Sequence, residues 1–413
     1  IHAFPSLSPA QGRTLITRLD KRFPPGEYFR QVRLRRSALA NRNRSREMLR
    51  DARLSFPPFG PVAAGAEASK DSLQGCAVLL TAGGEGERLR ESLRRDGYPP
   101  ERLDGITKPT FPLGGSFGEL GSLHVNLCLI ASLCGETGVD IPVIISTGPE
   151  GSITDRVVPR VPDEYPGCRP KHLRIVAQEA RLHLSVDEKV VWILRDGEPE
   201  PVVNPDETGG PLSALARGGP GGEPPVLSWL KELGCRRLLV LQATAIYDPR
   251  LLPAMASFSP ASDCVGVGIL RREFPPDDPF GTYVVVAREG EPSRLVILEQ
   301  EARDDRVRAL RESHDGWHLP FNTGFYALDP DVLDSHVLPD YATPPKAVAP
   351  GLPRSPKIGY AATDIVTFAR SPAVLAADPK LFAVIKNAED IKRLARRGEE
   401  MGLDRMCRTV LAP

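Results

Sequence analysis

The sequence predicts an α/β protein whose central sheet is mixed and mostly parallel. In the first half of the chain, short apolar runs alternate with helical patterns, which favours parallel strands with helices on both faces of the sheet. In the second half, apolar runs follow one another with fewer helices between them. That change of pattern favours an antiparallel part of the same sheet.

The individual elements follow from the apolar runs. The strand-like runs of the first half are Cys76–Leu80, Ile141–Ser146, Leu173–Ala177 and Leu238–Leu241. The helical patterns between them are Leu120–Leu133 and Val226–Leu233. The strand-like runs of the second half are Val265–Ile269, Tyr283–Ala287, Leu295–Leu298 and Phe321–Ala327. Runs this short and this rich in Val, Ile and Leu are typical of buried strands.

We expect the chain to be divided into three parts. Residues 1–70 are an arginine-rich helical segment and linker, 71–337 the main domain, and 338–413 a Pro-rich loop and C-terminal region. The N-terminal charge at Phe29–Leu54 is interrupted by Ser, Asn and Leu. A solvated helix packed on the main domain is therefore favoured over a basic binding arm.

Three flanking segments have patterns of their own. Phe56–Ser69 is rich in Pro, Gly and Ala, which predicts a linker. Leu338–Pro356 is Pro-rich and predicts an irregular loop. Ala388–Arg408 has apolar residues at helical spacing and predicts one amphipathic helix.

Composition limits the classes of partner. The chain has 413 residues, of which 53 are basic and 53 acidic, so its formal net charge is zero. A balanced charge predicts no nucleic-acid partner, and the absence of a long apolar stretch predicts no membrane span. The seven cysteines include no C-x-x-C pair, which predicts buried thiols in a reducing compartment, the cytoplasm. The sequence begins with Ile, so a removed targeting peptide is left open.

The stretch LLTAGGEGERL, from Leu79 to Leu89, places glycines directly after an apolar strand and an arginine shortly after them. Glycines there bring backbone N–H groups close to a ligand, and phosphate is the natural ligand of such a loop. No Gly-Lys-Ser/Thr follows, so the loop is not a P-loop. The dinucleotide fingerprint is only half met, because Leu89 stands where its third glycine should be.

The loop resembles the A-G-G-x-G-E-R-L opening of the UDP-sugar pyrophosphorylases, which belong with the UDP-glucose and UDP-N-acetylhexosamine pyrophosphorylases. Lys108-Pro109 supplies the Lys-Pro that follows this loop in sugar nucleotidyltransferases. Further segments resemble family motifs in the same order along roughly Gly75 to Ile391. They are AQEA (Ala177–Ala180), NPDETGGPLSAL (Asn204–Leu215), LVLQATAIYDP (Leu239–Pro249), FNTGFYALDP (Phe321–Pro330) and YAATDIV (Tyr360–Val366).

The resemblance implies a fold, a reaction and a set of site residues. The fold would be a Rossmann-like (GT-A-like) nucleotidyltransferase fold with a mixed central sheet, and residues 338–413 would close the sugar-phosphate side. The reaction would join a sugar 1-phosphate to UTP, giving a UDP-sugar and pyrophosphate, with Arg88 and Lys108 as the catalytic cations. The implied nucleotide-binding residues are Ala82, Gly83, Gly84, Gly86, Gln178, Gly209 and Gly210, and the implied substrate-binding residues are Glu299, Asn322 and Lys357.

The sequence departs from the family pattern at the metal and sugar-phosphate positions. Ala243 stands where the family has an aspartate that resembles a magnesium ligand, and Tyr360 stands where a phosphate-binding lysine is expected. We therefore expect Mg²⁺ to be held mainly by the nucleotide phosphates, with Asp364 as a weak candidate ligand. Two alternatives stay open: a non-catalytic relative that binds a nucleotide or sugar phosphate, and a transferase for another base or a cyclitol phosphate.

Overall fold

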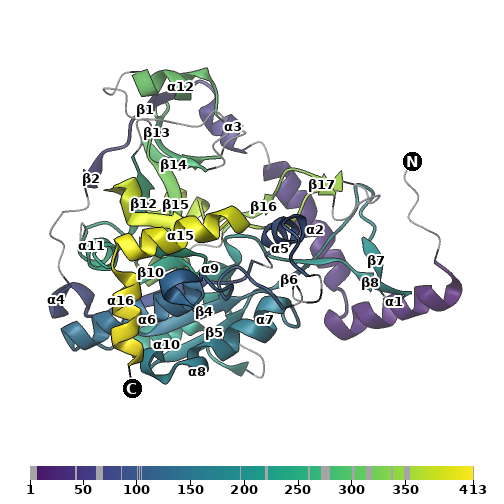
Figure 1. The fold of residues 1–413 in the computed structure, drawn as a ribbon. Coiled ribbons are helices and arrows are strands. Elements are labelled where there is room, and N and C mark those ends of the chain that lie inside the picture. The colour runs from purple at the N-terminus through teal and green to yellow at the C-terminus, as the bar shows by residue number, and fades with distance from the viewer. Residues whose placement is uncertain are drawn as a thin grey trace.

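The computed structural model describes residues 7–41, 44–61, 68–84, 86–99, 101, 103, 105–195, 197–218, 222–258, 261–270, 280–299, 303–312, 319–335, 338–347 and 354–412. Its centre is a mixed sheet with the order β2-β20-β12-β15-β10-β3-β4-β5, and β13, β14 and β1 extend it from β15 (Figure 1). These strands are β1 (Arg53–Ser55), β2 (Phe59–Pro61), β3 (Cys76–Thr81), β4 (Val143–Thr147), β5 (Leu173–Ala177), β10 (Arg237–Gln242), β12 (Cys264–Ile269), β13 (Thr282–Ala287), β14 (Arg294–Leu298), β15 (Phe321–Leu328) and β20 (Pro372–Ala377).

The strand directions confirm the expected mixed sheet. β10, β3, β4 and β5 are parallel neighbours, whereas β15 runs antiparallel to both β10 and β12. Each of the expected strands is present, with ends within two residues of the prediction. Strands of this kind are buried on both faces, which is why their sequences are continuous apolar runs.

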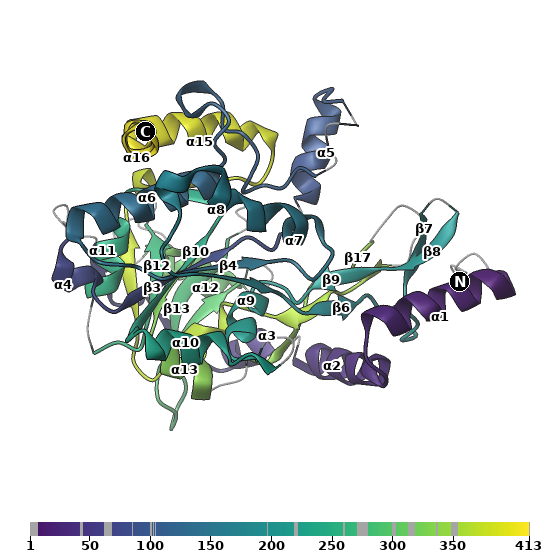
Figure 2. The same cartoon turned by 90° about the horizontal axis from the view of Figure 1, so that it is seen from below.

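Helices cover both faces of the sheet, as Figure 2 shows from below. Along β3, Val78 and Leu80 belong to the core on one face, and Ala77 and Leu79 to the core on the other. The first face packs against α4 (Lys70–Leu73), α5 (Glu87–Arg95), α6 (Ser122–Thr137), α8 (Val161–Glu164), α11 (Leu251–Ser257), α15 (Ala388–Glu400) and α16 (Leu403–Leu411). The second packs against α9 (Gly210–Leu215), α10 (Val226–Glu232), α13 (Pro330–Ser335) and α14 (Asp364–Phe368).

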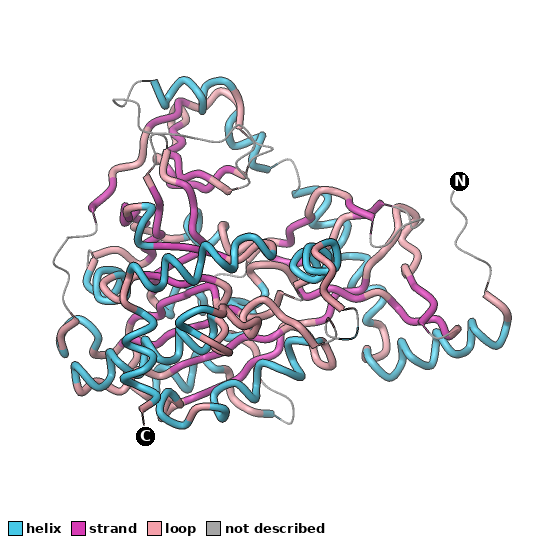
Figure 3. Tube along the Cα trace, viewed as in Figure 1, coloured by secondary structure: helices cyan, strands magenta, loops and turns pink. Residues whose placement is uncertain are grey.

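Smaller elements stand around this body (Figure 3). Near β13 and β14 lie α3 (Arg44–Leu49) and α12 (Asp305–Glu312). α7 (Ile153–Val157) follows β4, and β11 (Ala245–Tyr247) pairs with β21 (Phe382–Val384). Another group of elements lies to the right in Figure 1: α1 (Pro9–Arg22), α2 (Glu27–Asn41), β6 (Ala180–Leu182), β7 (Trp192–Arg195), β8 (Glu198–Pro201), β9 (Val203–Pro205), β16 (Asp340–Ala342), β17 (Lys346–Ala347), β18 (Arg354–Ser355) and β19 (Ile358–Tyr360).

The flanking segments correct three sequence predictions. The expected linker Phe56–Ser69 contains a strand, because Phe59–Pro61 pairs with β20 at the open edge of the sheet. The expected loop Leu338–Pro356 contains three short strands: β17 and β18 pair with each other, and β16 pairs with β19, which follows the segment. The expected helix Ala388–Arg408 is two helices, because Gly402 adopts the left-handed conformation with φ of +74° and ends the helical path.

The N-terminal helix α2 packs on the main body, as favoured from its interrupted charge. It ends at Asn41, well before the predicted end at Leu54. Its buried residues include Val32 and Ala38, which join small apolar clusters with the β6–β9 and β16–β19 pairs. All seven cysteines are free thiols, and all except the half-buried Cys134 are buried, as their apolar surroundings predicted.

Candidate functional site

The carboxyl ends of four parallel strands lie along one edge of the sheet. β10, β3, β4 and β5 end at Gln242, Thr81, Thr147 and Ala177 in adjacent register. From β3 the chain proceeds to β4 and β5 on one side and returns to β10 on the other. Such a topological switch point is where open α/β sheets bind ligands. The glycine loop, which begins after Thr81, lies at this point.

Gly83 leaves room for another predicted site residue. A Cβ atom added at Gly83 would overlap the side-chain Nε2 of Gln178 and lie 3.0 Å from the carbonyl oxygen of Thr147. The preceding Ala82 is buried and donates its backbone N–H to the Ser146 carbonyl at 2.7 Å. The loop backbone and the Gln178 amide therefore lie side by side at the ends of β3 and β5.

Gly84 faces open space, since a Cβ there would meet no described atom within 4 Å. Gly86 precedes α5 and has φ of +73°, a conformation that side chains disfavour. A Cβ on Gly86 would lie 3.3 Å from the backbone nitrogen of Lys108. The Lys-Pro segment thus packs directly on the loop. Glu85 lies outside the described residues.

Arg88 and Lys108 come close enough to interact. Burial lowers the pKa of Lys108, the positive charge of Arg88 lowers it further, and Asp390 at the start of α15 raises it. Arg88 is exposed on the first turn of α5. Arg90, on the same helix, donates to the Ile106 carbonyl at 3.0 Å and so ties α5 to the segment that carries Lys108. The two predicted catalytic cations therefore flank one loop.

Gly209 and Gly210 lie on the other side of Gln178. A Cβ on Gly210 would overlap Oδ1 of Asp206 and lie 2.9 Å from Oε1 of Gln178. Both oxygens are buried, and neither has a hydrogen-bond donor among the described residues. Gly209 packs against Tyr360 and donates its N–H to the Tyr360 carbonyl at 2.8 Å. Gln178 therefore lies between Gly83 and Gly210, two glycines about 130 residues apart in the printed sequence.

Asn322 lies at the start of β15, near the same edge of the sheet. Its Oδ1 accepts the hydroxyl of Tyr283 and the N–H of Gly324, both at 2.9 Å, and its Nδ2 donates to the hydroxyl of Tyr326 at 3.0 Å. Burial raises the pKa of Tyr326, and the nearby charges of Glu299 and Asp364 raise it further, while the hydrogen bond to Asn322 lowers it. The predicted residues Asn322, Glu299 and Asp364 are thus gathered around one buried tyrosine.

Lys357 lies on a different part of this region, beside β19. Its backbone exchanges two hydrogen bonds with Thr343, both at 3.0 Å. The pKa of His183 is lowered to about 4, chiefly by burial and in addition by the positive charges of Lys357 and Arg35. The ammonium group is therefore near His183.

Ala243, which replaces the expected aspartate, is completely buried in the main apolar core. Its carbonyl oxygen accepts the Ser122 hydroxyl at 2.7 Å, and its N–H donates to the Thr81 carbonyl at 3.1 Å. Among the described residues, no three His, Cys, Asp or Glu side chains come together as metal ligands. Within the same residues, no helix is both long and apolar enough to cross a bilayer.

A buried charge cluster next to Gln178 was not identified from the sequence. Arg181 is 1% exposed and Asp206 is 0% exposed. Arg181 pairs with Glu179, Asp206 pairs with Arg217, and Arg217 also pairs with Glu179. Burial raises the pKa of Asp206 to about 6, while the charges of Arg217 and Arg181 lower it. The one indication of this cluster in the sequence is Arg181, a charged residue directly after AQEA in a short strand.

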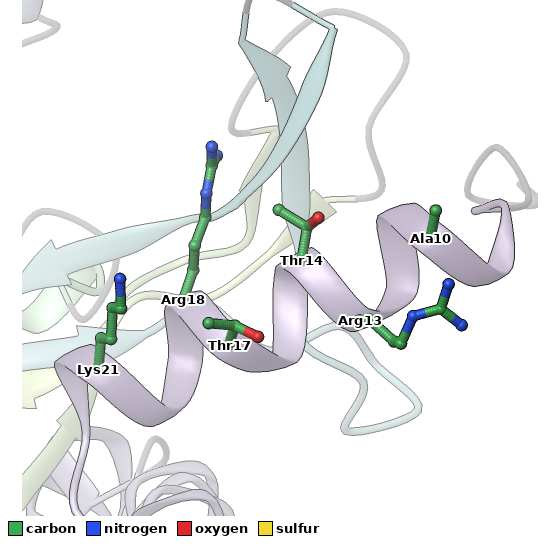
Figure 4. Close-up of a pocket in the computed structure, with 6 residues that line it drawn as sticks. All are labelled: Ala10, Arg13, Thr14, Thr17, Arg18 and Lys21. Atoms are coloured by element: carbon green, nitrogen blue, oxygen red, sulfur yellow. The ribbon is translucent and has the colours of Figure 1, made fainter.

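A separate surface depression lies along one side of α1, a helix that precedes the glycine loop in the sequence (Figure 4). It is lined by Ala10, Arg13, Thr14, Thr17, Arg18 and Lys21. Arg18 donates to the Pro199 carbonyl at 3.1 Å and pairs with Glu200 at 3.5 Å, so this cation already holds α1 on the β7–β8 pair. None of the predicted site residues lines this depression.

Comparison with solved structures identifies the fold as that of the UDP-sugar pyrophosphorylases, a class of nucleotidyltransferases. A UDP-N-acetylglucosamine pyrophosphorylase from Trypanosoma brucei, solved with an inhibitor, matches with a TM-score of 0.67 and 15% identity over 94% of this chain and 79% of that one. A UDP-glucose pyrophosphorylase variant from Leishmania major, solved with UDP-glucose, matches with a TM-score of 0.61 and 14% identity over the same shares. No family sequence model and no curated protein matches the chain by sequence.

Proposed function

We propose that this chain is a nucleotidyltransferase that joins a sugar 1-phosphate to UTP and releases pyrophosphate. One observation carries the proposal. The glycine loop at the switch point has Gln178 packed on Gly83 and the Lys108 segment packed on Gly86. The loop backbone, the Gln178 amide and the Lys108 segment thus lie together at the strand ends, and Arg88 follows the loop directly.

The chemistry needs positioning and charge more than it needs a protein nucleophile. An oxygen of the sugar phosphate attacks the α-phosphorus of UTP in line, and pyrophosphate leaves with the bonding electrons. Arg88 would bind the β- and γ-phosphates with its planar guanidinium group, and Lys108 would neutralise charge at the α-phosphate. The lowered pKa of Lys108, caused first by burial, makes a bound phosphate a favourable partner for its charged form.

The described residues offer no carboxylate cage for a resident metal ion. Ala243 cannot ligate an ion, and its side chain lies inside the apolar core. We therefore assign Mg²⁺ to the substrate, as the complex that it forms with UTP. The role of Asp364 as a ligand stays a prediction, as do the substrate contacts of Glu299, Asn322 and Lys357.

Pyrophosphate release tests the proposal. The purified protein is incubated with Mg²⁺, one nucleoside triphosphate and a panel of sugar and cyclitol phosphates, and pyrophosphate is measured for UTP, CTP, GTP, ATP and dTTP in turn. Release with UTP and a sugar 1-phosphate is expected. Release only with another base or a cyclitol phosphate would replace the proposed substrates.

The absence of an aspartate at Ala243 favours one second candidate, a relative that binds a nucleotide without turnover. Calorimetric titration with UTP separates the two functions. Tight binding together with no pyrophosphate from any pair in the panel would establish the second candidate and overturn the first.

A further inference from the structure

A network of six charged side chains, three of them buried and three half-buried, surrounds the segment that carries Gln178. Its carboxylates are Glu27, Glu179 and Asp206, and its cations are Arg30, Arg181 and Arg217. Three positive and three negative groups balance one another when all are ionised. The members come from α2, from β6 and the residue before it, and from the segments on either side of α9.

Glu179 is the centre of this network. Its carboxylate accepts from Arg217 at 2.5 Å, lies 3.3 Å from Nη2 of Arg181, and forms an ion pair with Arg30 of α2. Glu179 directly follows Gln178 in the chain. The ion pairs that orient the Glu179 carboxylate therefore also orient the backbone that carries the Gln178 amide. Arg30 itself is fixed by a two-point contact with Glu27, at 2.7 and 2.6 Å.

Asp206 connects the same network to the Gly209–Gly210 segment. Its Oδ2 accepts from Arg217 at 3.4 Å and lies 4.0 Å from Arg181. Its backbone carbonyl accepts the Tyr360 N–H at 3.0 Å, and β19, which contains Tyr360, packs on β16 and α2. The N-terminal helix α2 therefore reaches both sides of Gln178, directly through Arg30 and indirectly through β19.

Two acceptor oxygens remain without a donor where these segments meet. Oε1 of Gln178 and Oδ1 of Asp206 both face Gly210 and are buried. A buried acceptor without a donor is costly, so a ligand N–H placed there would be bound selectively. Uracil presents a ring N–H beside a carbonyl oxygen, whereas cytosine presents an acceptor nitrogen at that ring position. The spacing of these oxygens thus affects which base fits.

We infer that the Glu27, Arg30, Glu179, Arg181, Asp206 and Arg217 network sets the spacing between Gln178 and Gly210, and that base discrimination consequently depends on the N-terminal helix α2. Arg30 acts as a positioning residue through Glu179 and does not contact the nucleotide. The inference rests on the proposed nucleotide site. A charge-balanced network suits this task, because in some proteins such ion pairs fix one arrangement of the segments that they join.

The test compares affinities for UTP and CTP by calorimetry, in the presence of Mg²⁺, for the full chain and three variants of α2. Arg30→Gln should reduce the preference for UTP over CTP roughly tenfold, mostly through weaker UTP binding. A tenfold change is the usual scale of energetic coupling between neighbouring residues. Arg30→Lys should restore part of the preference. Arg36→Gln is the matched control, because it removes an exposed ion pair between the same helix and Glu188 and leaves the network intact.

A second readout does not depend on nucleotide binding. Hydrogen exchange in peptides 173–182 and 203–215 should rise in Arg30→Gln and not in Arg36→Gln. Should Arg30→Gln fail to fold, Glu27→Gln, which keeps the side-chain shape and removes the carboxylate that fixes Arg30, gives the same measurement of UTP preference.

The outcomes separate this inference from the proposed function. A UTP preference that stays within twofold in both network variants would overturn the inference while the nucleotide site stands. A wild-type protein that binds both triphosphates equally would also overturn it. A wild-type protein that binds no triphosphate would overturn the proposed function and this inference together.

Discussion

The two sides of the candidate site differ in the atoms that they present. On the glycine-loop side, the backbone of Gly83 lies against Gln178 and that of Gly86 against the Lys108 segment. Gly84 faces open space. On the β15 side, Asn322 is hydrogen-bonded to two buried tyrosine hydroxyls. In the proposed function, the first side would bind the phosphates through backbone N–H groups and cations. On the second, the Asn322 amide is already committed within the protein, so a ligand must compete with existing bonds.

A family resemblance in sequence is therefore more informative about the glycine loop than about the β15 side. A glycine required by a positive φ or by close backbone approach has few replacements, so a loop built on such glycines keeps a recognisable sequence pattern. A sugar-binding surface built from side chains can exchange donors and acceptors in many ways. The departures at Ala243 and Tyr360 accordingly fall outside the loop.

The largest expected effect is on stability, at Asp206. Its pKa is raised from 3.8 to about 6 by burial, with Arg217 and Arg181 opposing the rise and Glu207 adding to it. A raised carboxyl pKa stabilises the folded state below pH 3.8, and this stabilisation is lost as pH rises through about 6. The difference corresponds to roughly 3 kcal/mol. Urea unfolding from pH 4 to 7 should therefore show a steeper loss of stability in the wild type than in Asp206→Asn.

Other carboxylates titrate in the same range, so the comparison is between the two proteins at each pH. Asp263→Asn is a suitable control, since Asp263 lies at the N-terminal end of β12, away from the glycine loop. Parallel pH curves for wild type and Asp206→Asn would show that the Asp206 carboxyl titrates normally.

The next effect is on turnover, at Lys108. A cation near the α-phosphate gains interaction as charge shifts during in-line attack, so its removal should act on kcat more than on UTP affinity. Lys108→Ala should lower kcat about 100-fold, the scale for loss of one electrostatic stabiliser. Lys171→Ala is the control, because Lys171 precedes β5 and pairs with Asp140 at 2.6 Å. Nearly full kcat in Lys108→Ala would show that another cation has this role.

A smaller effect is expected on affinity, at Gly84. A Cβ atom added at Gly84 meets no described atom within 4 Å in the free protein, so Gly84→Val should leave the fold unaffected. The same side chain would occupy space needed by phosphate oxygens and should weaken UTP binding by about tenfold or more, roughly 1.4 kcal/mol. Gly135→Val on the exposed side of α6 is the matched control, since it also faces open space. Unchanged calorimetric affinity in Gly84→Val would exclude the loop as the phosphate site.

The sequence predicted the elements that local pattern determines. Apolar runs predicted the strands, and the spacing of the glycines predicted the loop. Both patterns depend little on residues that are distant in the sequence. The charge network could not be predicted in this way, because Arg30 and Glu179 are 149 residues apart and neither is unusual in its own segment. The position of Asn322 was likewise predictable as the start of β15, whereas its tyrosine partners depend on how β13 and β15 meet at Thr282 and Phe321.

The smallest expected effect concerns Asn322, and it decides how that residue is used. If the amide serves mainly to satisfy the buried hydroxyls of Tyr283 and Tyr326, Asn322→Ala should lower the free energy of unfolding by about 1 kcal/mol. The KM for the sugar phosphate should then change less than threefold, since a side chain already bonded on both ends gives the substrate little. A double-mutant cycle with Tyr283→Phe measures the coupling directly, because removing both partners should cost less than the sum of the single changes. Tyr247→Phe is the control, since that buried hydroxyl has no hydrogen-bond partner among the described residues. A KM increase of tenfold or more, with unfolding unchanged, would instead show that Asn322 turns to the substrate and that the β15 side, like the loop side, is open to its ligand.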